Sequence, residues 1–222
     1  MMPPFWHFGD PVAPLRAVLA RGGVLAIPTE SSYGLAADPR NPAGVAAVYR
    51  IKGRDAGKAL PVVIADRGQL AGLGIDPDLP ILVPLSACWP GPLTVILPLL
   101  PLVQMPPGAR QIPAAGGGTS LAVRVPGHAG LRRLLAELGH GLTATSANRS
   151  GGEPIVDPWE AAALLGERAV DGVDGAMIVD GGVLPGGAPS TLVAIEESGP
   201  VVLRSGRFPV ERLRECLMEK KV

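Results

Sequence analysis

Residues 41–64 read NPAGVAAVYRIKGRDAGKALPVVI, which suggests a helix, a charged connection and a strand in direct succession. Asn41 followed by Pro42 is a typical helix start, because a short polar side chain caps the first turn and proline fits its backbone angle. The apolar run 60–64 is typical of a buried strand. A helix joined to a buried strand predicts a protein in which helices pack on a sheet.

The connection carries much of the local charge. Arg50, Lys52, Arg54 and Lys58 stand with one acid, Asp55, within nine residues of a chain whose formal net charge is zero. Such a cluster favours an anion site, since binding groups are commonly displayed on loops. The alternative is a solvated cationic loop, because exposed charge runs are common.

Helices and strands alternate outward from this segment. The same helix start occurs at Asp10-Pro11 and Asp157-Pro158, and leucines at helical spacing predict a further helix over residues 129–138. Strands are predicted at residues 24–27, 93–97, 121–125, 142–145, 176–179, 191–195 and 201–203. This mixture predicts an α/β or α+β fold, although the strand order cannot be read from the pattern.

Length and composition limit the class of protein that this sequence can be. A chain of 222 residues can bury a sizeable core, and its 30 Gly and 25 Pro predict many turns. The longest apolar stretch, 93–103, is shorter than a membrane span and contains prolines, so we expect no membrane segment. The start of the sequence lacks the features of a secretion signal, which favours a cytoplasmic location. Residues 101–119, rich in Pro and Gly, predict one long loop, either a lid or a passive connection.

Cysteine and histidine spacing gives no metal signature. Cys88 and Cys216 belong to no Cys-x-x-Cys pair, so we expect two isolated thiols and neither a disulfide nor a zinc site. His7, His128 and His140 lack ligand spacing and are expected to be structural, with any metal arriving on a ligand. Zero net charge disfavours extensive nucleic-acid binding, although a local patch would still allow contact with RNA.

Small polar residues directly follow three predicted strands. These segments are PTESSYGL at 28–35, TSANRSG at 145–151 and PST at 189–191. Hydroxyl and amide groups at strand ends can hold a small polar ligand, and glycine lets backbone donors approach a phosphate. For each segment taken alone, turn formation and helix capping are the favoured explanation for its small polar residues.

In combination and in order, six motifs resemble the YrdC/TsaC family of threonylcarbamoyl-AMP synthases. They are PTE and YGL within 28–35, KxR at 52–54, WPGPLT at 89–94, AVRVP at 122–126, SxN at 146–148 and LRSG at 203–206. The resemblance implies a YrdC-like twisted mixed sheet with flanking helices and a concave basic face that holds ligands. It further implies a single domain over 10–207 and a C-terminal helix or tail over 208–222, without the additional C-terminal domain of longer family members.

The activity implied by this resemblance is that of a nucleotidyltransferase. L-Threonine, bicarbonate and ATP are joined into threonylcarbamoyl-adenylate, with release of pyrophosphate, and the product is used to modify tRNA beside the anticodon. Mg²⁺ would be carried by ATP, and no resident metal is expected. Partner proteins would transfer the threonylcarbamoyl group to adenosine, so direct tRNA contact is not required.

The resemblance also assigns residues. Lys52, Arg54, Ser146 and Asn148 would form the catalytic phosphate and carbamate site, with Ser120, Pro154 and Arg204 around the nucleotide. The residues implied for threonine are Thr29, Tyr33, Arg124, Ala144 and Ser190. Arg124 would pair with the carboxylate of the amino acid, while Thr29 and Ser190 would offer hydrogen bonds.

Two other functions remain open at this point. Family members have also been viewed as double-stranded RNA or tRNA binders, but aromatic residues are only 4% here and none cluster with the cations to stack bases. The related domain of hydrogenase-maturation carbamoyltransferases makes carbamoyl-adenylate without threonine. That domain normally lies in a larger chain with acylphosphatase and zinc-finger segments, and neither is visible in this sequence.

Overall fold

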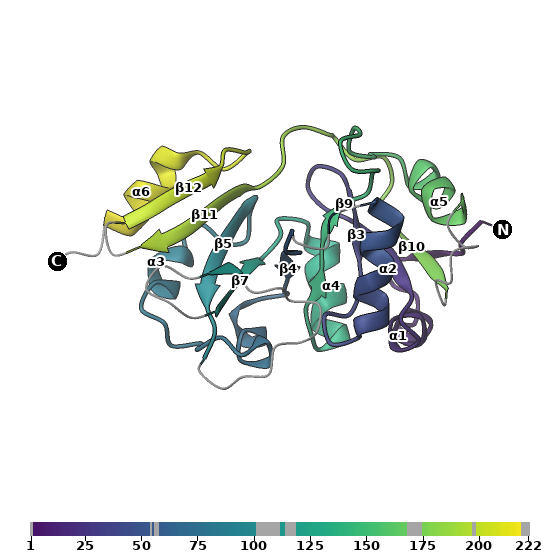
Figure 1. Cartoon of the computed structure of the whole chain (residues 1–222), viewed down its shortest axis with the longest axis horizontal. Coiled ribbons are helices and arrows are strands. Elements are labelled where there is room, and N and C mark those ends of the chain that lie inside the picture. Colours follow the sequence, from purple (N-terminus) through teal and green to yellow (C-terminus); the bar gives the residue numbers. More distant parts are fainter. Residues whose placement is uncertain are drawn as a thin grey trace.

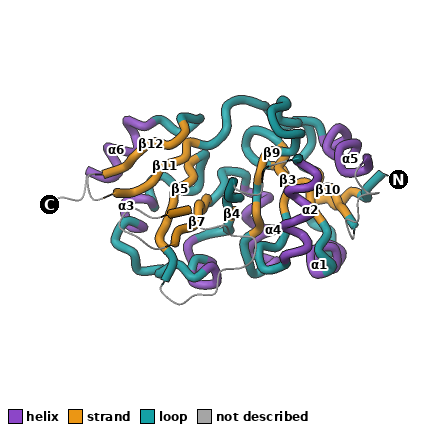
Figure 2. Tube along the Cα trace, in the orientation of Figure 1, coloured by secondary structure: helices purple, strands orange, loops and turns teal. Residues whose placement is uncertain are grey.

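The computed structural model describes residues 2–53, 55, 58–100, 112–113, 119–167, 175–196 and 199–218. Arg54 and nearly all of the predicted loop 101–119 lie outside these residues. Figures 1 and 2 show β-strands in two groups along the long axis, with helices around them. The mixed sheets and flanking helices confirm the predicted α/β class.

The five-stranded sheet lies nearer the N-terminus. Its order is β1 (Phe5–His7), β10 (Ala176–Asp180), β2 (Val24–Pro28), β3 (Tyr33–Ala36) and β9 (Thr145–Ser146). Helices α1 (Ala13–Ala20) and α4 (Ala129–Leu138) cover one face, and α2 (Pro42–Lys52) and α5 (Pro158–Glu167) cover the other. Because both faces are covered, every residue of β2 is buried.

The seven-stranded sheet lies nearer the C-terminus. Its order is β12 (Gly199–Arg204), β11 (Thr191–Glu196), β5 (Leu93–Pro98), β7 (Thr119–Arg124), β4 (Val62–Val63) and β8 (Leu142–Thr143), with β6 (Ile112–Pro113) also paired to β7. Helices α3 (Leu82–Leu85) and α6 (Val210–Met218) contact each other beside it, and short 3₁₀ turns at Arg67–Gln69 and Ala71–Leu73 complete this half. One apolar cluster fills most of its core, while Val63 and Leu142 pack in the cluster that contains α1 and α4.

Residues 142–146 connect the two sheets. The sequence predicted one strand at 142–145, whereas the structure divides this segment at Ala144. Thr143 pairs with Val62 in one sheet, and Thr145 pairs with Leu35 in the other. Ala144 keeps its own hydrogen bond by donating its amide to the carbonyl of Pro61 at 2.8 Å. This short segment therefore contributes Leu142–Thr143 to one sheet and Thr145–Ser146 to the other.

Helix starts were predicted with mixed success. Asn41 caps α2 as expected, since its Oδ1 accepts from the amides of Ala43 and Gly44, and Asp157 likewise accepts from the amide of Trp159 at 2.7 Å. The predicted cap at Asp10 is wrong. Asp10 instead accepts from the amide of His7 at 2.8 Å, and α1 begins at Ala13 without a side-chain cap.

The two cysteines are not isolated from each other. Cys88 lies in the apolar core of the C-terminal half, and Cys216 of α6 packs against the same cluster. Burial and a hydrogen bond with Cys216 raise the pKa of Cys88 to about 12. The expectation of two separate thiols is therefore wrong, although both cysteines are free.

The histidines take part in local structure. His128 caps α4 by accepting the amide of Leu131 at its Nδ1, while His7 and His140 lie 3.4 and 3.7 Å from the carboxylates of Asp180 and Asp38. Within the described ranges, no three His, Cys, Asp or Glu side chains gather as a metal site. No helix in that part of the chain is both long and apolar enough to cross a bilayer.

Candidate active site

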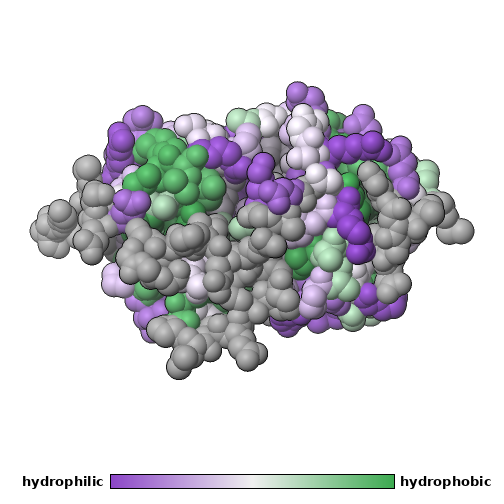
Figure 3. All heavy atoms as spheres, viewed as in Figure 1, coloured by the Kyte–Doolittle hydropathy of each residue, from purple (hydrophilic) through white to green (hydrophobic). Residues whose placement is uncertain are grey.

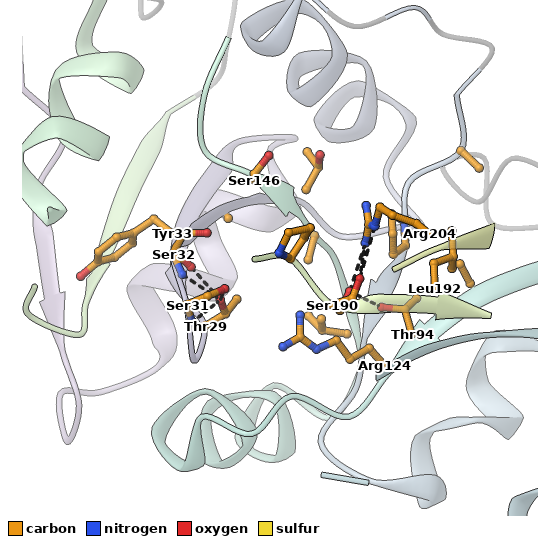
Figure 4. Close-up of a pocket in the computed structure, with 18 residues that line it drawn as sticks. Thr29, Ser31, Ser32, Tyr33, Thr94, Arg124, Ser146, Ser190, Leu192 and Arg204 are labelled. Carbon is orange, nitrogen blue, oxygen red and sulfur yellow. Dashed lines mark hydrogen bonds between the residues drawn. The ribbon is translucent and has the colours of Figure 1, made fainter. Parts of the chain in front are cut away.

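A cavity of about 220 Å³ opens where the two sheets meet. One side consists of the β2–β3 turn and residues 144–146, and the other consists of side chains from β5, β7, the start of β11 and β12. Figure 4 shows polar side chains from these elements around the shared space. The cavity brings together seven of the predicted residues: Thr29, Tyr33, Arg124, Ala144, Ser146, Ser190 and Arg204.

Thr29 lies at the start of the turn that follows β2. Its hydroxyl donates to the carbonyl of Ser32 at 2.7 Å and accepts from the amides of Ser31 and Ser32, both at 3.3 Å. Turn formation, the alternative explanation for this segment, therefore holds for Thr29. The same turn carries Thr29, Ser31 and Ser32 into the cavity wall, so it also presents polar groups to a ligand.

Arg124 is the last residue of β7. Its backbone is fixed by strands on both sides, since β7 pairs with β5 and β4. Its Nε donates to the carbonyl of Gly91 at 3.1 Å, and its Nη2 forms an ion pair with Oε1 of Glu30. A largely buried guanidinium at a cavity wall favours a ligand with a carboxylate, because the two groups have matching charge and planar geometry.

Ser190 is the centre of a hydrogen-bonded group. Its hydroxyl lies 2.7 Å from the hydroxyl of Thr94, and the Nη2 of Arg204 donates to its carbonyl at 2.9 Å and to its hydroxyl at 3.2 Å (Figure 4). Gly206 permits this arrangement, because a Cβ there would overlap the carbonyl oxygen of Pro189. The glycine of the LRSG motif thus lets the chain approach Ser190 closely.

Lys52 lies in a cluster with two other predicted residues. Its Nζ donates to the carbonyl of Ser146 at 2.7 Å and to its hydroxyl at 3.1 Å, and it also reaches the side-chain oxygen of Asn148. The hydroxyl of Ser146 donates to that same oxygen at 2.8 Å. We call Lys52, Ser146 and Asn148 the Lys52 cluster. Of its members, the described cavity lining includes Ser146.

The position of Lys52 corrects one expectation. The sequence pattern predicted a surface connection, but Lys52 is the last residue of α2 and is only 4% exposed. Gly53 ends the helix in a left-handed conformation with φ of 59°, which glycine adopts without strain. The helix end therefore directs Lys52 inward to the Lys52 cluster.

The remaining predicted residues are placed differently. The ring of Tyr33 points away from the cavity (Figure 4), and its hydroxyl donates to the carbonyl of Gly182 at 2.9 Å. Burial raises the pKa of Tyr33 to about 12. Tyr33 lines the cavity although its ring lies outside it, and its role in binding threonine stays a prediction. Ser120 is buried within β7 and Pro154 is exposed; the described cavity lining includes neither. Arg54 is not among the described residues.

Thr94 and Glu30, both within the quoted motifs, contact predicted site residues although no role was predicted for either. Thr94 is 2% exposed and lines the cavity beside Ser190, and Glu30 forms the ion pair with Arg124. Thr94 follows the first residue of a buried strand, where a polar side chain among apolar neighbours is itself a signal. The partner of Glu30 is 94 residues away along the chain, so no local pattern could indicate it.

Comparison of the sequence with known protein families identifies the family of this chain. The Sua5/YciO/YrdC family model, described as Telomere recombination, matches residues 17–206. The chain belongs to the Sua5/YciO/YrdC family. This membership confirms the resemblance drawn from the six motifs.

Named members of the Sua5/YciO/YrdC family align over most of the chain. A Threonylcarbamoyl-AMP synthase of Thiobacillus denitrificans is 38% identical over 186 residues, which is 81% of this chain and 88% of that protein. One of Alkalilimnicola ehrlichii is 36% identical over 192 residues, covering 84% and 91%. The crystal structure of P. abyssi Sua5 complexed with L-threonine matches with a TM-score of 0.76 and 27% identity over 99% of this chain. The chain spans 62% of the length of that Sua5.

Proposed function

We propose that the protein is a threonylcarbamoyl-AMP synthase, which makes threonylcarbamoyl-adenylate and pyrophosphate from L-threonine, bicarbonate and ATP. The names of the Thiobacillus and Alkalilimnicola relatives support this proposal, as does the L-threonine in the P. abyssi Sua5 structure. The observation that carries it is the convergence of Arg124, Thr94 and Ser190 in one cavity with Ser146 of the Lys52 cluster. Such a cavity offers an amino-acid end and a phosphate end.

The amino-acid end suits a small zwitterion. The whole cavity measures about 220 Å³, less than the roughly 300–1,000 Å³ of pockets for drug-sized ligands, so its amino-acid end has room only for a small molecule. In the proposed complex, Arg124 pairs with the carboxylate of threonine, and the hydroxyls of Thr94 and Ser190 accept or donate hydrogen bonds. Ala144 provides the small side chain that leaves room between the two sheets.

The phosphate end suits charge stabilisation. The amine of threonine attacks the carbon of bicarbonate and water leaves, which gives a carbamate. A carbamate oxygen then attacks the α-phosphorus of ATP while the bond to pyrophosphate breaks. Both partners are anions, so catalysis requires alignment and cationic neutralisation. In the proposal, the positive charge of Lys52, held in the Lys52 cluster, stabilises the reacting anions, and Arg54 and Arg204 add two further positive charges. ATP binds as its Mg²⁺ complex.

The fate of the product belongs to the same proposal. An adenylate with a good leaving group must be consumed quickly, so we expect a protein that transfers the threonylcarbamoyl group to tRNA adenosine. This use would place the protein in the cytoplasm. Direct binding of tRNA is not needed for the reaction itself.

The test is pyrophosphate release from ATP, labelled bicarbonate and each amino acid in turn. We expect release to require L-threonine and bicarbonate together, because the nucleophile is their adduct. Turnover that is independent of threonine would indicate a carbamoyl-adenylate enzyme. Double-stranded RNA binding without any pyrophosphate release would contradict catalysis and favour the binding function.

A further inference from the structure

Glu30 and Arg124 form an ion pair between elements far apart in the sequence. Oε1 of Glu30 contacts Nη2 of Arg124 and accepts from the amide of Gly127 at 3.2 Å. The side chains are 19% and 10% exposed, so the pair is largely removed from water. The backbone of Glu30 is also held, because Arg207 donates to its carbonyl at 2.9 Å. These contacts therefore restrict the movement of both the carboxylate and the backbone of Glu30.

The charge on Glu30 is maintained by its partner. Burial alone would raise the pKa of this carboxyl, but the attraction and hydrogen bond of Arg124, with the nearby backbone amides, lower it below its ordinary value. Oε2 of Glu30 is buried without a hydrogen-bond partner among the described residues. A buried carboxylate oxygen without a donor destabilises the fold. The structure thus retains an unfavourable group whose local effect is to hold Arg124.

Arg124 keeps several N–H donors for a ligand after its contacts with Gly91 and Glu30. A guanidinium has five N–H groups. The Nε–H of Arg124 goes to the carbonyl of Gly91, and one N–H of Nη2 goes to Glu30. About three N–H groups then remain for other contacts, enough for a ligand carboxylate to bind through two parallel hydrogen bonds. Both protein contacts restrict the rotation of the guanidinium before any ligand arrives.

We propose that Glu30 is a positioning residue, which orients Arg124 so that its remaining donors meet the carboxylate of the amino acid. This inference rests on the proposed function and adds a residue to which the motifs gave no role. Glu30 acts only through Arg124, and the described cavity lining contains Arg124 but not Glu30. Fixing the guanidinium in advance removes part of the entropy cost of binding.

Calorimetric titration with L-threonine and with ATP tests this role in the full chain. We expect Glu30→Ala to weaken threonine binding at least tenfold while ATP binding changes less than twofold. Glu30→Gln should recover part of the loss, because its amide oxygen still accepts from Arg124. Glu137→Ala, an exposed position on α4, is the matched control and should bind both ligands as the wild type does. Threonine binding by Glu30→Ala that equals or exceeds the wild type overturns the proposal. So does an equal loss of both ligands together with a lower melting temperature.

A second measurement needs no ligand. The side-chain ¹⁵N resonances of Arg124, assigned with Arg124→Lys, report rotation about the bond between Cζ and Nη2. We expect this rotation to be at least tenfold faster in Glu30→Ala than in the wild type. Equal rates overturn the positioning role. A wild type that shows slow rotation yet binds no threonine would contradict the proposed function and leave the orientation of Arg124 by Glu30 supported.

Discussion

Lys52 is a buried cation surrounded by oxygen atoms, so its replacement affects both activity and stability. Lys52→Met keeps the apolar stem but removes one of the two donors to the carbonyl of Ser146 and one of the two donors to the side-chain oxygen of Asn148. We expect kcat to fall at least 100-fold, because the charge acts on the transition state. The free energy of unfolding should fall by about 1.5–3 kcal/mol, the typical contribution of a hydrogen bond that involves a charged group.

Pyrophosphate release and urea denaturation measure these two effects of Lys52→Met. Arg133→Met, on the exposed face of α4, is the control and should change neither. Normal activity in Lys52→Met would contradict a phosphate role for the Lys52 cluster. Normal stability would show that the hydrogen bonds from the Ser146 hydroxyl and the Asn148 amide are sufficient for these oxygen atoms.

Thr94 tests the amino-acid end of the cavity. Thr94→Val has nearly the same shape but lacks the hydroxyl that lies 2.7 Å from that of Ser190. We expect the KM for L-threonine to rise about tenfold, since one buried hydrogen bond typically contributes about 0.5–1.5 kcal/mol. The KM for ATP should stay within twofold. Thr119→Val, at the partly exposed start of β7, is the matched control. Equal changes in both KM values would instead indicate a general distortion of the sheet.

Helix α4 should make stability depend on pH through its cap. Burial, the largest cause, lowers the pKa of His128 below the ordinary 6.5, while Glu30 opposes this effect and Arg132 and Arg133 reinforce it. The neutral ring accepts the amide of Leu131 at 3.1 Å. As the pH falls below about 6.5, the unfolded chain binds a proton before the native protein does. Stability from this group is therefore fully present above that pH and is lost as the pH falls through the lower native pKa.

Urea denaturation at pH 7.5 and pH 5.5 measures this effect. His128→Asn keeps a capping oxygen but cannot titrate, so the loss of stability between the two pH values should be smaller than in the wild type. The lowered pKa values of Glu30 and Asp38 affect stability only at more acidic pH. An unchanged difference in His128→Asn would assign the pH dependence to another group.

Sequence patterns predicted features that depend on neighbouring residues better than features that depend on contacts between residues far apart in the chain. Helix α4 was predicted at its observed bounds, because leucine spacing and the apolar face are local properties. β3 was taken for a polar loop, since its first residue follows the turn of Thr29 and its burial comes from α2, α5 and β9. The family resemblance assigned Arg124 and Ser190 to the site, but their contacts with Glu30 and Thr94 could not be read from the sequence because they depend on the fold. The family resemblance assigned Tyr33 to the site; Tyr33 does line the cavity, but its ring points away from it.

The position of the cavity predicts how the whole protein responds to its ligand. Because the lining comes from both sheets, a bound amino acid adds contacts between the two halves. At 100 times the dissociation constant, L-threonine should raise the free energy of unfolding by about 2.7 kcal/mol. Hydrogen exchange should slow in β7 and in residues 142–146 together. Slower exchange in one sheet only would show that the ligand contacts only one half.

Residues 142–146 also constrain how this protein can change during evolution. Successive side chains of a strand point to opposite faces, so one inserted residue reverses every side chain beyond it. If Leu142 and Thr143 kept their pairing after an insertion at Ala144, Ser146 would turn away from the cavity. If Ser146 kept its pairing instead, the side chains of Leu142 and Thr143 would change faces. Loops elsewhere can lengthen at little cost, since each doubling of loop length adds only about 0.6 kcal/mol. Gaps in family alignments should therefore accumulate in the connections and be absent from these five positions.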